Sequence, residues 1–455
     1  MAIVTINPAT GHTIKSYPEI SAQEIGEIVT QAHQAFVAWR RTSFTQRAAT
    51  MKNVGELLRK DHASHARLMA EEMGKPLAQG RSEIEKCAWV CDYYAEHAEH
   101  FLAPEHIASD ASKSFVTFEP LGILLAVMPW NFPFWQVFRA AVPALMAGNA
   151  VLLKHASNVP ACALAIEDGF QQAGLPQGLF RSLLVGSAHV AELIEHPLVK
   201  AVTLTGSTPA GKAVAANAGA MLKKTVLELG GSDPYIILED ADLEATAQAC
   251  VASRLMNGGQ SCIAAKRFIV VESLRKPFEA LFVQKMRAYR MGDPLQEDTT
   301  IGPLARRDLR DALHDQVQRS ITKGARLLLG GTIPNRPGAY YPPTVLTEVA
   351  KGMPVYDEET FGPVAAIISV KDEAQAIQVA NDSPFGLGAA IFTTNSPRGE
   401  RIAIEQLDVG CCFVNTFVRS DPRLPFGGIK QSGYGRELSV FGIREFVNTK
   451  TVYVK

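Results

Sequence analysis

Hydrophobic and polar residues follow two different periods along the chain, and the change falls after residue 100. From Ser21 to His100 apolar residues recur at spacings of three and four, with few glycines, which predicts amphipathic helices. Two short apolar runs follow, and we expect strands at Phe115–Phe118 and Leu121–Pro129. The second run has no polar alternation, which is typical of a strand buried on both faces.

From residue 150 onwards, strand-like and helix-like segments alternate. The expected strands are Ala150–Lys154, Ser182–Val185 and Ala201–Thr205, then, beyond Glu228, Tyr235–Leu238 and Phe268–Val271. The expected helices are Ala161–Gln172, Ala188–Glu195, Pro209–Ala218, Leu243–Met256 and Phe278–Tyr289. Such alternation predicts right-handed βαβ units and parallel sheets with covered faces. We therefore expect an α/β fold.

The length of the chain indicates more than one domain. A chain of 455 residues is too long for one hydrophobic core, because single cores stop growing at about 250–300 residues. We expect two principal domains, the second beginning near Gly230. Residues 447–455 alternate as a terminal strand, and an edge strand there would be open to pairing with another subunit.

Charge and cysteine content exclude several classes of protein. Lys and Arg number 45 and Asp and Glu 46, so the net charge is −1, without the basic excess of nucleic-acid-binding proteins. The most apolar stretches, residues 121–130 and 140–153, are shorter than a membrane span of about 20 residues, and the first residues do not resemble a secretory signal. Seven cysteines fit reduced thiols better than disulfides, so we expect a cytoplasmic protein. Cys87 and Cys91 have no further ligands nearby in the sequence, and we expect no metal site.

The segment from Gly206 to Ala213 nearly matches a phosphate-binding loop. Ala213 lacks the hydroxyl that such a loop uses to hold magnesium, and Pro209 lacks a backbone N–H, so a nucleoside triphosphatase is disfavoured. Gly206 and Ser207 still stand where a strand gives way to a helix, and a helix N-terminus favours an anion such as a pyrophosphate. A simple turn capped by Ser207 is the alternative.

Lys154 and Ser157 follow another predicted strand. Ligands of open α/β sheets bind beyond the carboxyl ends of the strands, so these two side chains are candidates for holding an adenosine ribose. The glycine fingerprint of the common dinucleotide-binding fold is absent from the chain.

Three short motifs carry candidate catalytic groups. Cys262 follows two glycines in a polar loop (NGGQSC), and a thiolate there could attack a carbonyl carbon. Glu228 ends an apolar run before two glycines, so desolvation would raise its pKa toward that of a general base. Asn131 lies between two prolines (PWNFP), and its amide could donate to an oxyanion. Each motif alone is more typical of a structural feature.

Taken together, the motifs resemble those of the aldehyde dehydrogenase superfamily. PWNFP (129–133), ELGG (228–231), GQSC (259–262), EETFGP (358–363) and PFGGIKQSG (425–433) occur in the family's order and spacing and span nearly the whole chain. AAKRF after the cysteine, KHA at Lys154 and ELSVFG near the end further resemble the bacterial succinate-semialdehyde dehydrogenase branch. The resemblance implies a Rossmann-type parallel-sheet cofactor domain, an α/β catalytic domain and small β oligomerisation segments.

The resemblance also implies a role for each matching residue. Cys262 would be the nucleophile that forms a thiohemiacetal and then a thioester, Glu228 the base that activates water, and Asn131 with the Cys262 N–H the oxyanion hole. The implied cofactor contacts are Trp130, Lys154, Ser157, Gly206, Ser207, Glu359 and Phe361. Hydride would pass to the nicotinamide.

Two departures from the family pattern bear on specificity. Many NAD-dependent relatives carry an acid three residues after the ribose lysine, whereas Ser157 stands there in this chain, so we expect NADP to be preferred, with NAD possible. Arg139 falls where succinate-semialdehyde dehydrogenases bind the far carboxylate of the substrate, and we expect Trp135 and Ser420 beside it. The alternative for Arg139 is an internal ion pair with an acid.

The resemblance leaves the substrate and the assembly open. The expected reaction is oxidation of succinate semialdehyde to succinate, with glutarate semialdehyde or a broad range of aldehydes as the alternative and an inactive structural relative as a more remote one. The expected divisions are residues 1–106 and 121–229 for the dinucleotide-binding domain, 230–430 for the catalytic domain, and 107–120 and 445–455 for oligomerisation. A homodimer or homotetramer is expected.

Overall fold

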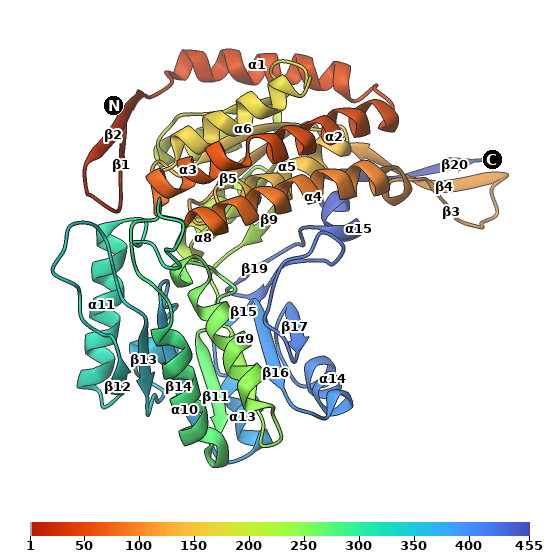
Figure 1. Ribbon diagram of the computed structural model, residues 1–455. Helices are drawn as coiled ribbons and strands as arrows, with labels where there is room; N and C mark the ends of the chain where they lie inside the picture. The colour runs from red at the N-terminus through yellow and green to blue at the C-terminus, as the bar shows by residue number, and fades with distance from the viewer. Residues whose placement is uncertain (1) are drawn as a thin grey trace.

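The computed structural model describes residues 2–455, which form two sheets, each flanked by helices, and a projecting β arm (Figure 1). The first sheet has six strands. In sheet order they are β19 (Gly433–Tyr434), β9 (Lys224–Glu228), β8 (Val199–Thr205), β5 (Ile123–Met128), β6 (Ala150–His155) and β7 (Phe180–Ser182). All of its strands run parallel except β19, which pairs antiparallel with β9.

Eight helices belong to this half of the molecule. Their bounds are α1 (Ala22–Trp39), α2 (Phe44–Lys60), α3 (His62–Met73), α4 (Leu77–Phe101), α5 (Trp135–Met146), α6 (Pro160–Gln172), α7 (Val190–Glu195) and α8 (Thr208–Ala220), with a 3₁₀ turn at Ser187–His189. Ser21 and Ser43 begin α1 and α2 with reciprocal capping contacts to Glu24 and Gln46, which satisfy free N–H groups of the first turn. The expected helical stretch before residue 100 is confirmed.

The second sheet has seven strands. In sheet order they are β12 (Arg326–Leu329), β13 (Thr344–Thr347), β14 (Val364–Val370), β11 (Arg267–Val271), β10 (Pro234–Ile237), β16 (Gly388–Phe392) and β17 (Cys411–Val414). All run parallel except β12. The helices of this half are α9 (Leu243–Leu255), α10 (Glu272–Arg287), α11 (Arg307–Thr322), α12 (Pro354–Asp357), α13 (Glu373–Asn381) and α14 (Ser396–Glu405), with a 3₁₀ turn at Met256–Gly259.

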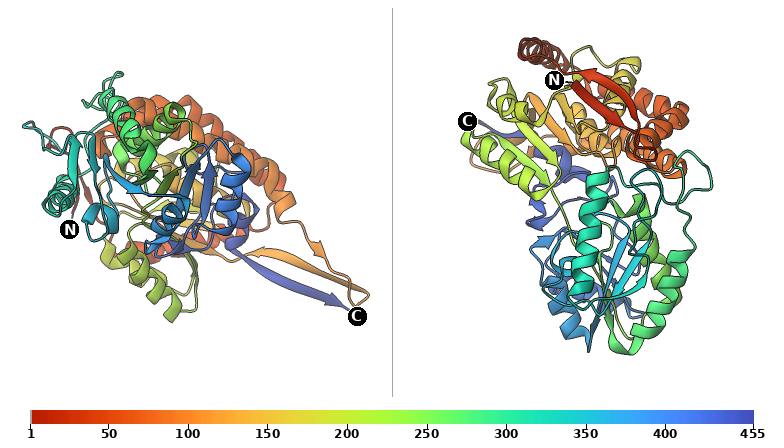
Figure 2. Two further views of the ribbon diagram at one scale, coloured as in Figure 1. Left: turned by 90° about the horizontal axis from the view of Figure 1, so that it is seen from below. Right: turned by 90° about the vertical axis from the view of Figure 1, so that its left-hand side faces the viewer.

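Small β elements complete the fold. The projecting arm pairs β20 (Val447–Val454) with β4 (Lys113–Pro120), and β3 (Glu105–His106) joins its edge. Figure 2 shows this arm extending away from the body, with the C-terminus near its tip. The other pairs are β1 (Ala2–Ile6) with β2 (Thr13–Pro18), and β15 (Phe385–Gly386) with β18 (Ile429–Lys430). The short helix α15 (Ser439–Glu445) leads into β20.

The α/β class is confirmed, and one predicted strand was misplaced. The strand expected at Ser182–Val185 is β7, which covers Phe180–Ser182 instead. It pairs with β6 only as far as Leu153, and the chain then turns toward the following 3₁₀ turn. Leu183 and Val185 lie beyond the strand but are buried in the same hydrophobic core, so hydrophobicity alone could not place the end of the strand.

Candidate active site

The residues expected to hold a cofactor follow three adjacent strands of the first sheet. β8, β5 and β6 lie side by side and run parallel, so their carboxyl ends meet at one edge. Gly206 follows β8, Trp130 follows β5, and Lys154 lies at the end of β6 with Ser157 just beyond it. Strand order thus brings together groups that are far apart in the sequence.

The Gly206–Ser207 turn opens helix α8. The Ser207 side chain accepts a hydrogen bond from the N–H of Ala210 at 3.5 Å, so the expected helix cap is present. The Gly206 N–H donates to the carbonyl of Glu228 at 2.9 Å, which ties this turn to the end of β9. The positive end of the α8 dipole faces the same sheet edge as Lys154.

Lys154 and Ser157 offer different chemistry to a ligand. The Lys154 ammonium is buried, which lowers its pKa, and among residues 2–455 no carboxylate lies within 4.0 Å of it. Ser157 is exposed and carries no charge. A buried cation without an anionic partner fits a ligand that brings its own polar groups.

The loop before Cys262 has an unusual backbone. Asn257, Gly258 and Gly259 have φ values of 53°, 62° and 76°, a left-handed run that glycine adopts without steric cost. The Asn257 amide donates to the carbonyls of Gln260 at 3.1 Å and Asn131 at 2.7 Å. These contacts fix the loop against the PWNFP segment.

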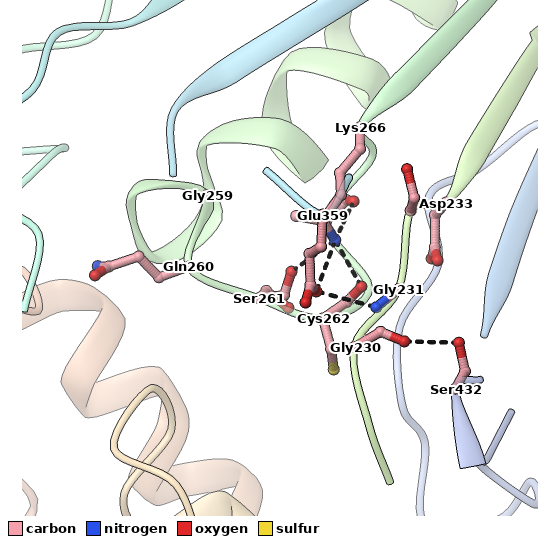
Figure 3. Close-up of polar contacts among 12 residues, drawn as sticks. Gly230, Gly231, Asp233, Gly259, Gln260, Ser261, Cys262, Lys266, Glu359 and Ser432 are labelled. Carbon is pink, nitrogen blue, oxygen red and sulfur yellow. Dashed lines mark hydrogen bonds and ion pairs between the residues drawn. The ribbon is translucent and has the colours of Figure 1, made fainter. Parts of the chain in front are cut away.

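Lys266 anchors the same loop from the other side. Its ammonium donates to the carbonyls of Cys262 at 2.8 Å and Ser261 at 3.2 Å, and it lies 3.6 Å from a carboxylate oxygen of Glu359 (Figure 3). The Cys262 sulfur points away from Lys266 in this view. A charge-assisted contact to the backbone on either side of the thiol fixes its direction.

Close packing explains the double glycine after Glu228. A Cβ atom on Gly231 would lie 2.8 Å from the Cys262 carbonyl oxygen, and one on Gly230 would collide with the Glu359 carboxylate. The Gly231 N–H donates to Glu359 at 3.0 Å. Glu359 therefore lies directly against the loop of Cys262, as Figure 3 shows.

Trp130 and Phe361 meet beside this cluster. Their ring centroids are 5.8 Å apart and nearly perpendicular, a favourable edge-to-face arrangement. Seven positions expected to contact a cofactor thus fall into two groups, one along the edge of the first sheet and one around Glu359.

The amide expected to stabilise an oxyanion contacts the loop that carries the Cys262 thiol. Asn131 is buried, and its side-chain amide donates to the carbonyl of Gln260 at 3.1 Å, which leaves one N–H of that amide to donate elsewhere. Cys262 is half-buried, and burial raises the pKa of its thiol to about 12, although Arg139 and Lys266 oppose that rise. The resting thiol is therefore protonated at neutral pH.

Glu228 lies deeper than the thiol. It is 1% exposed, and within residues 2–455 neither carboxylate oxygen has a hydrogen-bond partner. Burial, and then the neighbouring carboxyl of Glu437, raise its pKa well above the usual value. Its side chain lies outside the lining of the cavity that Cys262 faces, so it must turn to meet a water there.

A cavity of about 580 Å³ opens onto the Cys262 thiol. Its wall combines aromatic and charged side chains from both halves of the chain, among them Lys86, Trp89, Phe132, Trp135, Arg139, Cys262, Arg419, Ser420, Asp421 and Phe426. The Ser420 hydroxyl accepts from the Trp135 indole at 3.1 Å and from the Lys86 ammonium at 2.8 Å. All three positions expected to contact the substrate therefore face one space.

Arg139 is not free in this space. It forms a buried ion pair with Glu437, donates to the Thr205 hydroxyl at 3.3 Å, and lies 4.7 Å from the centre of the Phe426 ring. The internal ion pair left open as the alternative for Arg139 is thus present, although the side chain still lines the cavity.

Comparison with known proteins identifies the family. The model of the aldehyde dehydrogenase family matches residues 1–452. The chain belongs to the aldehyde dehydrogenase family. It is 50% identical over 454 residues to a probable succinate-semialdehyde dehydrogenase [NADP(+)] from Synechocystis, covering 100% of both chains. It is 48% identical to the succinate semialdehyde dehydrogenase [NAD(P)+] Sad of Escherichia coli, covering 99% of this chain and 97% of that one.

Solved structures agree with this assignment. The crystal structure of succinic semialdehyde dehydrogenase from Streptococcus pyogenes in complex with NADP+ superimposes with a TM-score of 0.97 at 37% identity, covering 99% of each chain. The expected fold of this aldehyde dehydrogenase is thereby confirmed in both halves.

Three side chains of this dehydrogenase site escaped the sequence analysis. Lys266 and Glu437 lie in the AAKRF and ELSVFG segments, which were noticed only as marks of resemblance. Lys86 lies on α4, where the helical pattern gave no reason to separate it from solvated lysines. Hydrophobic periodicity shows which face of a helix is buried. It cannot show that a distant segment of the chain, here the one that carries Ser420, covers Lys86.

The described residues hold neither a cluster of metal-ligating side chains nor a helix that could span a membrane. Residues 2–455 contain no group of three or more His, Cys, Asp or Glu side chains placed to hold a metal ion. All seven cysteines are free thiols. None of the helices in the described part of the chain is long and apolar enough to cross a membrane.

Proposed function

We propose that this aldehyde dehydrogenase oxidises succinate semialdehyde to succinate with NADP+ as the preferred cofactor. One observation carries the proposal: the Cys262 thiol and cationic side chains share a cavity of about 580 Å³. A cation buried in a substrate cavity favours a substrate that carries an anion. The names of the full-length relatives from Synechocystis and Escherichia coli support the same substrate.

Cys262 acts as the nucleophile on the aldehyde carbon. Its thiol gives its proton to water in the cavity, the thiolate sulfur forms the C–S bond as the C=O π bond breaks, and the carbonyl oxygen becomes the oxyanion of a thiohemiacetal. The free N–H of the Asn131 amide and the backbone N–H of Cys262 stabilise that charge. Bound NADP+ would supply the hydride acceptor that converts this adduct to a thioester.

Glu228 serves the second half of the reaction. Once turned toward the cavity, its carboxylate takes a proton from a water molecule, which attacks the thioester and releases the acid while Cys262 regains its thiol. Burial raises the pKa of Glu228, and a turn toward the water of the cavity would relieve that burial and favour the carboxylate form that accepts the proton.

The cofactor is held at the edge of the first sheet. Lys154 and Ser157 contact the adenosine ribose, and Gly206 and Ser207 at the start of α8 contact the pyrophosphate. The remaining contacts, from Trp130, Glu359 and Phe361, hold the nicotinamide half. The absence of an acid at Ser157 leaves room for the 2′-phosphate of NADP, and NAD remains usable.

The assembly and setting are proposed on the same family grounds. Residues 1–106 and 121–229 form the dinucleotide-binding domain, and residues 230–430 form the catalytic domain. Residues 107–120 and 445–455 form a projecting arm whose open edge suits pairing with a second copy, and we expect a cytoplasmic homodimer or homotetramer. Glutarate semialdehyde, one methylene longer, is the second candidate substrate, because the cavity carries the same charge for it.

Steady-state kinetics test the proposed function. Formation of NADPH from NADP+, or of NADH from NAD+, is followed with succinate semialdehyde, glutarate semialdehyde and butanal. We expect the highest kcat/KM for succinate semialdehyde with NADP+. Equal kcat/KM for butanal would contradict the substrate, and no turnover of any aldehyde would contradict the activity.

A further inference from the structure

Two cations line the substrate cavity from neighbouring helices, but only one has an anionic partner. Arg139 on α5 pairs with Glu437. Lys86 on α4 donates to the Ser420 hydroxyl at 2.8 Å, and its ammonium lies 4.3 Å from the centre of the Trp135 ring. Among residues 2–455 no carboxylate lies within 4.0 Å of the Lys86 ammonium.

The acids nearest to Lys86 are already engaged. Glu83 forms a buried ion pair with Lys75 and accepts from the N–H groups of Phe134 and Trp135 at 2.9 and 3.0 Å. Asp421 pairs with Arg423 at 2.7 Å. Within residues 2–455 two cations of the cavity lack an ion pair, Lys86 and Arg419, and only Lys86 is partly buried, whereas Arg419 is exposed. A partly buried charge without compensation is costly unless a ligand supplies the anion.

The hydrogen bonds of Ser420 are a second, independent indication that an anion binds beside Lys86. Its oxygen accepts two hydrogen bonds, from Lys86 and from the Trp135 indole, which occupies both lone pairs. The hydroxyl hydrogen of Ser420 is left to donate, and within the described residues it has no acceptor. A carboxylate placed between Ser420 and Lys86 would accept from both.

We propose that Lys86, together with Ser420, binds the terminal carboxylate of the substrate and is the main determinant of specificity for semialdehyde acids. This proposal rests on the function proposed above and identifies the side chain that binds the terminal carboxylate of the substrate. Arg139, whose charge Glu437 already matches, acts mainly as a positioning residue that holds Glu437 beside Glu228 and contributes less to carboxylate binding.

The electrostatic surroundings of Lys86 support this division. Burial, and then the like charge of Arg139, lower the pKa of Lys86 to about 8, while Cys87, Asp421 and Glu83 oppose that fall. A substrate carboxylate beside the ammonium would favour its protonated form. Arg139, in contrast, lies close enough to the thiol to be the largest influence opposing the raised pKa of Cys262.

The test compares two substrates of equal chain length on matched variants. Lys86→Met removes the charge and keeps an apolar stem of similar length over Trp135, Lys86→Arg keeps the charge, and Arg419→Met removes an exposed cation at the rim of the same cavity. Kinetics with NADP+ are measured for succinate semialdehyde and butanal, together with inhibition by succinate, in each variant and in the unaltered enzyme.

We expect Lys86→Met to lower kcat/KM for succinate semialdehyde by about 10- to 100-fold, as for loss of a hydrogen bond to a charged group, mainly through KM. Butanal turnover should stay within about threefold, which also reports that the variant is folded, and the succinate inhibition constant should rise in parallel. Lys86→Arg should recover part of the loss. Arg419→Met removes an exposed and therefore screened charge, so it should lower kcat/KM for succinate semialdehyde by less than about fivefold.

Two results separate failure of this inference from failure of the proposed function. If the unaltered enzyme uses butanal as well as succinate semialdehyde, the proposed substrate is wrong. If it prefers succinate semialdehyde and Lys86→Met keeps that preference, or if Arg419→Met loses as much, Lys86 is not the group that reads the carboxylate.

Discussion

The nucleotide side and the aldehyde side of the active site are formed by different kinds of structural element. On the nucleotide side, five of the seven candidate contacts lie at the ends of β5, β6 and β8, three adjacent strands within one stretch of chain, and two of them, Ser157 and Ser207, are exposed. On the aldehyde side, the wall combines residues of α4, α5, the loop of Cys262 and the segment 417–426. The position of the nucleotide contacts depends on strand order and on where helices begin. The aldehyde side instead depends on buried charges, each of which needs an oppositely charged partner.

This difference predicts how each side responds to substitution. A change at an exposed nucleotide contact alters a screened interaction worth about 1 kcal/mol or less. A change on the aldehyde side removes a reacting group or leaves a buried charge unpaired, which costs several times more.

Cys262→Ala should abolish the reaction without disturbing the nucleotide side. Loss of the nucleophile should lower kcat/KM for succinate semialdehyde by roughly 10,000-fold or more, while the dissociation constant for NADP+, measured by fluorescence titration, should stay within about threefold. Cys411→Ala is the matched control, because Cys411 is also half-buried and packs near Gly427. Comparable activity in both variants would mean that Cys262 is not the nucleophile.

Arg139→Met should destabilise the aldehyde side through the charge it leaves behind. Breaking a buried ion pair at one partner costs about 3–5 kcal/mol, because the other partner stays buried and unpaired. Thermal unfolding of Arg139→Met should therefore occur at a lower temperature than that of the unaltered enzyme. The double variant Arg139→Met with Glu437→Leu should recover most of the loss, and failure to do so would show that Arg139 acts on stability through other contacts.

The same contrast explains what the sequence could reveal. Gly206, Ser207 and Lys154 were recognisable because each follows an apolar strand in the chain itself. Cys262, Glu228 and Asn131 each stand within a contiguous motif. The pairing of Arg139 with Glu437 joins residues almost 300 positions apart, and the contact of Lys86 with Ser420 spans 334 positions. No local pattern encodes such contacts, because they depend on which segments pack together across the cavity.

Asn131→Ala should slow the chemical step with little effect on folding. Removing one oxyanion donor typically lowers kcat by about 100- to 1,000-fold, and the effect should appear with succinate semialdehyde and butanal alike. Gln136→Ala is the control, since it removes a buried amide that does line the cavity. A loss confined to KM in Asn131→Ala would instead indicate a contact made equally in the ground state.

Alkaline pH should weaken discrimination on the aldehyde side. With a pKa of about 8, Lys86 is charged at pH 7 and mostly neutral at pH 9, where the ratio of kcat/KM for succinate semialdehyde to that for butanal should fall roughly tenfold. The ratio cancels the titration of Cys262 and Glu228, which both substrates share. The ratio should not vary with pH in Lys86→Met, and an equal fall in that variant would assign the titration to another group.

Ser157→Glu should produce the smallest change and confine it to the nucleotide side. Ser157 is exposed, so an added carboxylate acts through solvent and is worth about 1 kcal/mol, or roughly fivefold. The carboxylate repels the 2′-phosphate of NADP+ and accepts from the 2′-hydroxyl of NAD+, so KM should rise for the first cofactor and fall for the second. Ser64→Glu, which adds the same charge on the exposed face of α3, should leave both values unchanged. Because the aldehyde side is untouched, the preference for succinate semialdehyde over butanal should remain in Ser157→Glu, and its loss would show that the two sides are coupled.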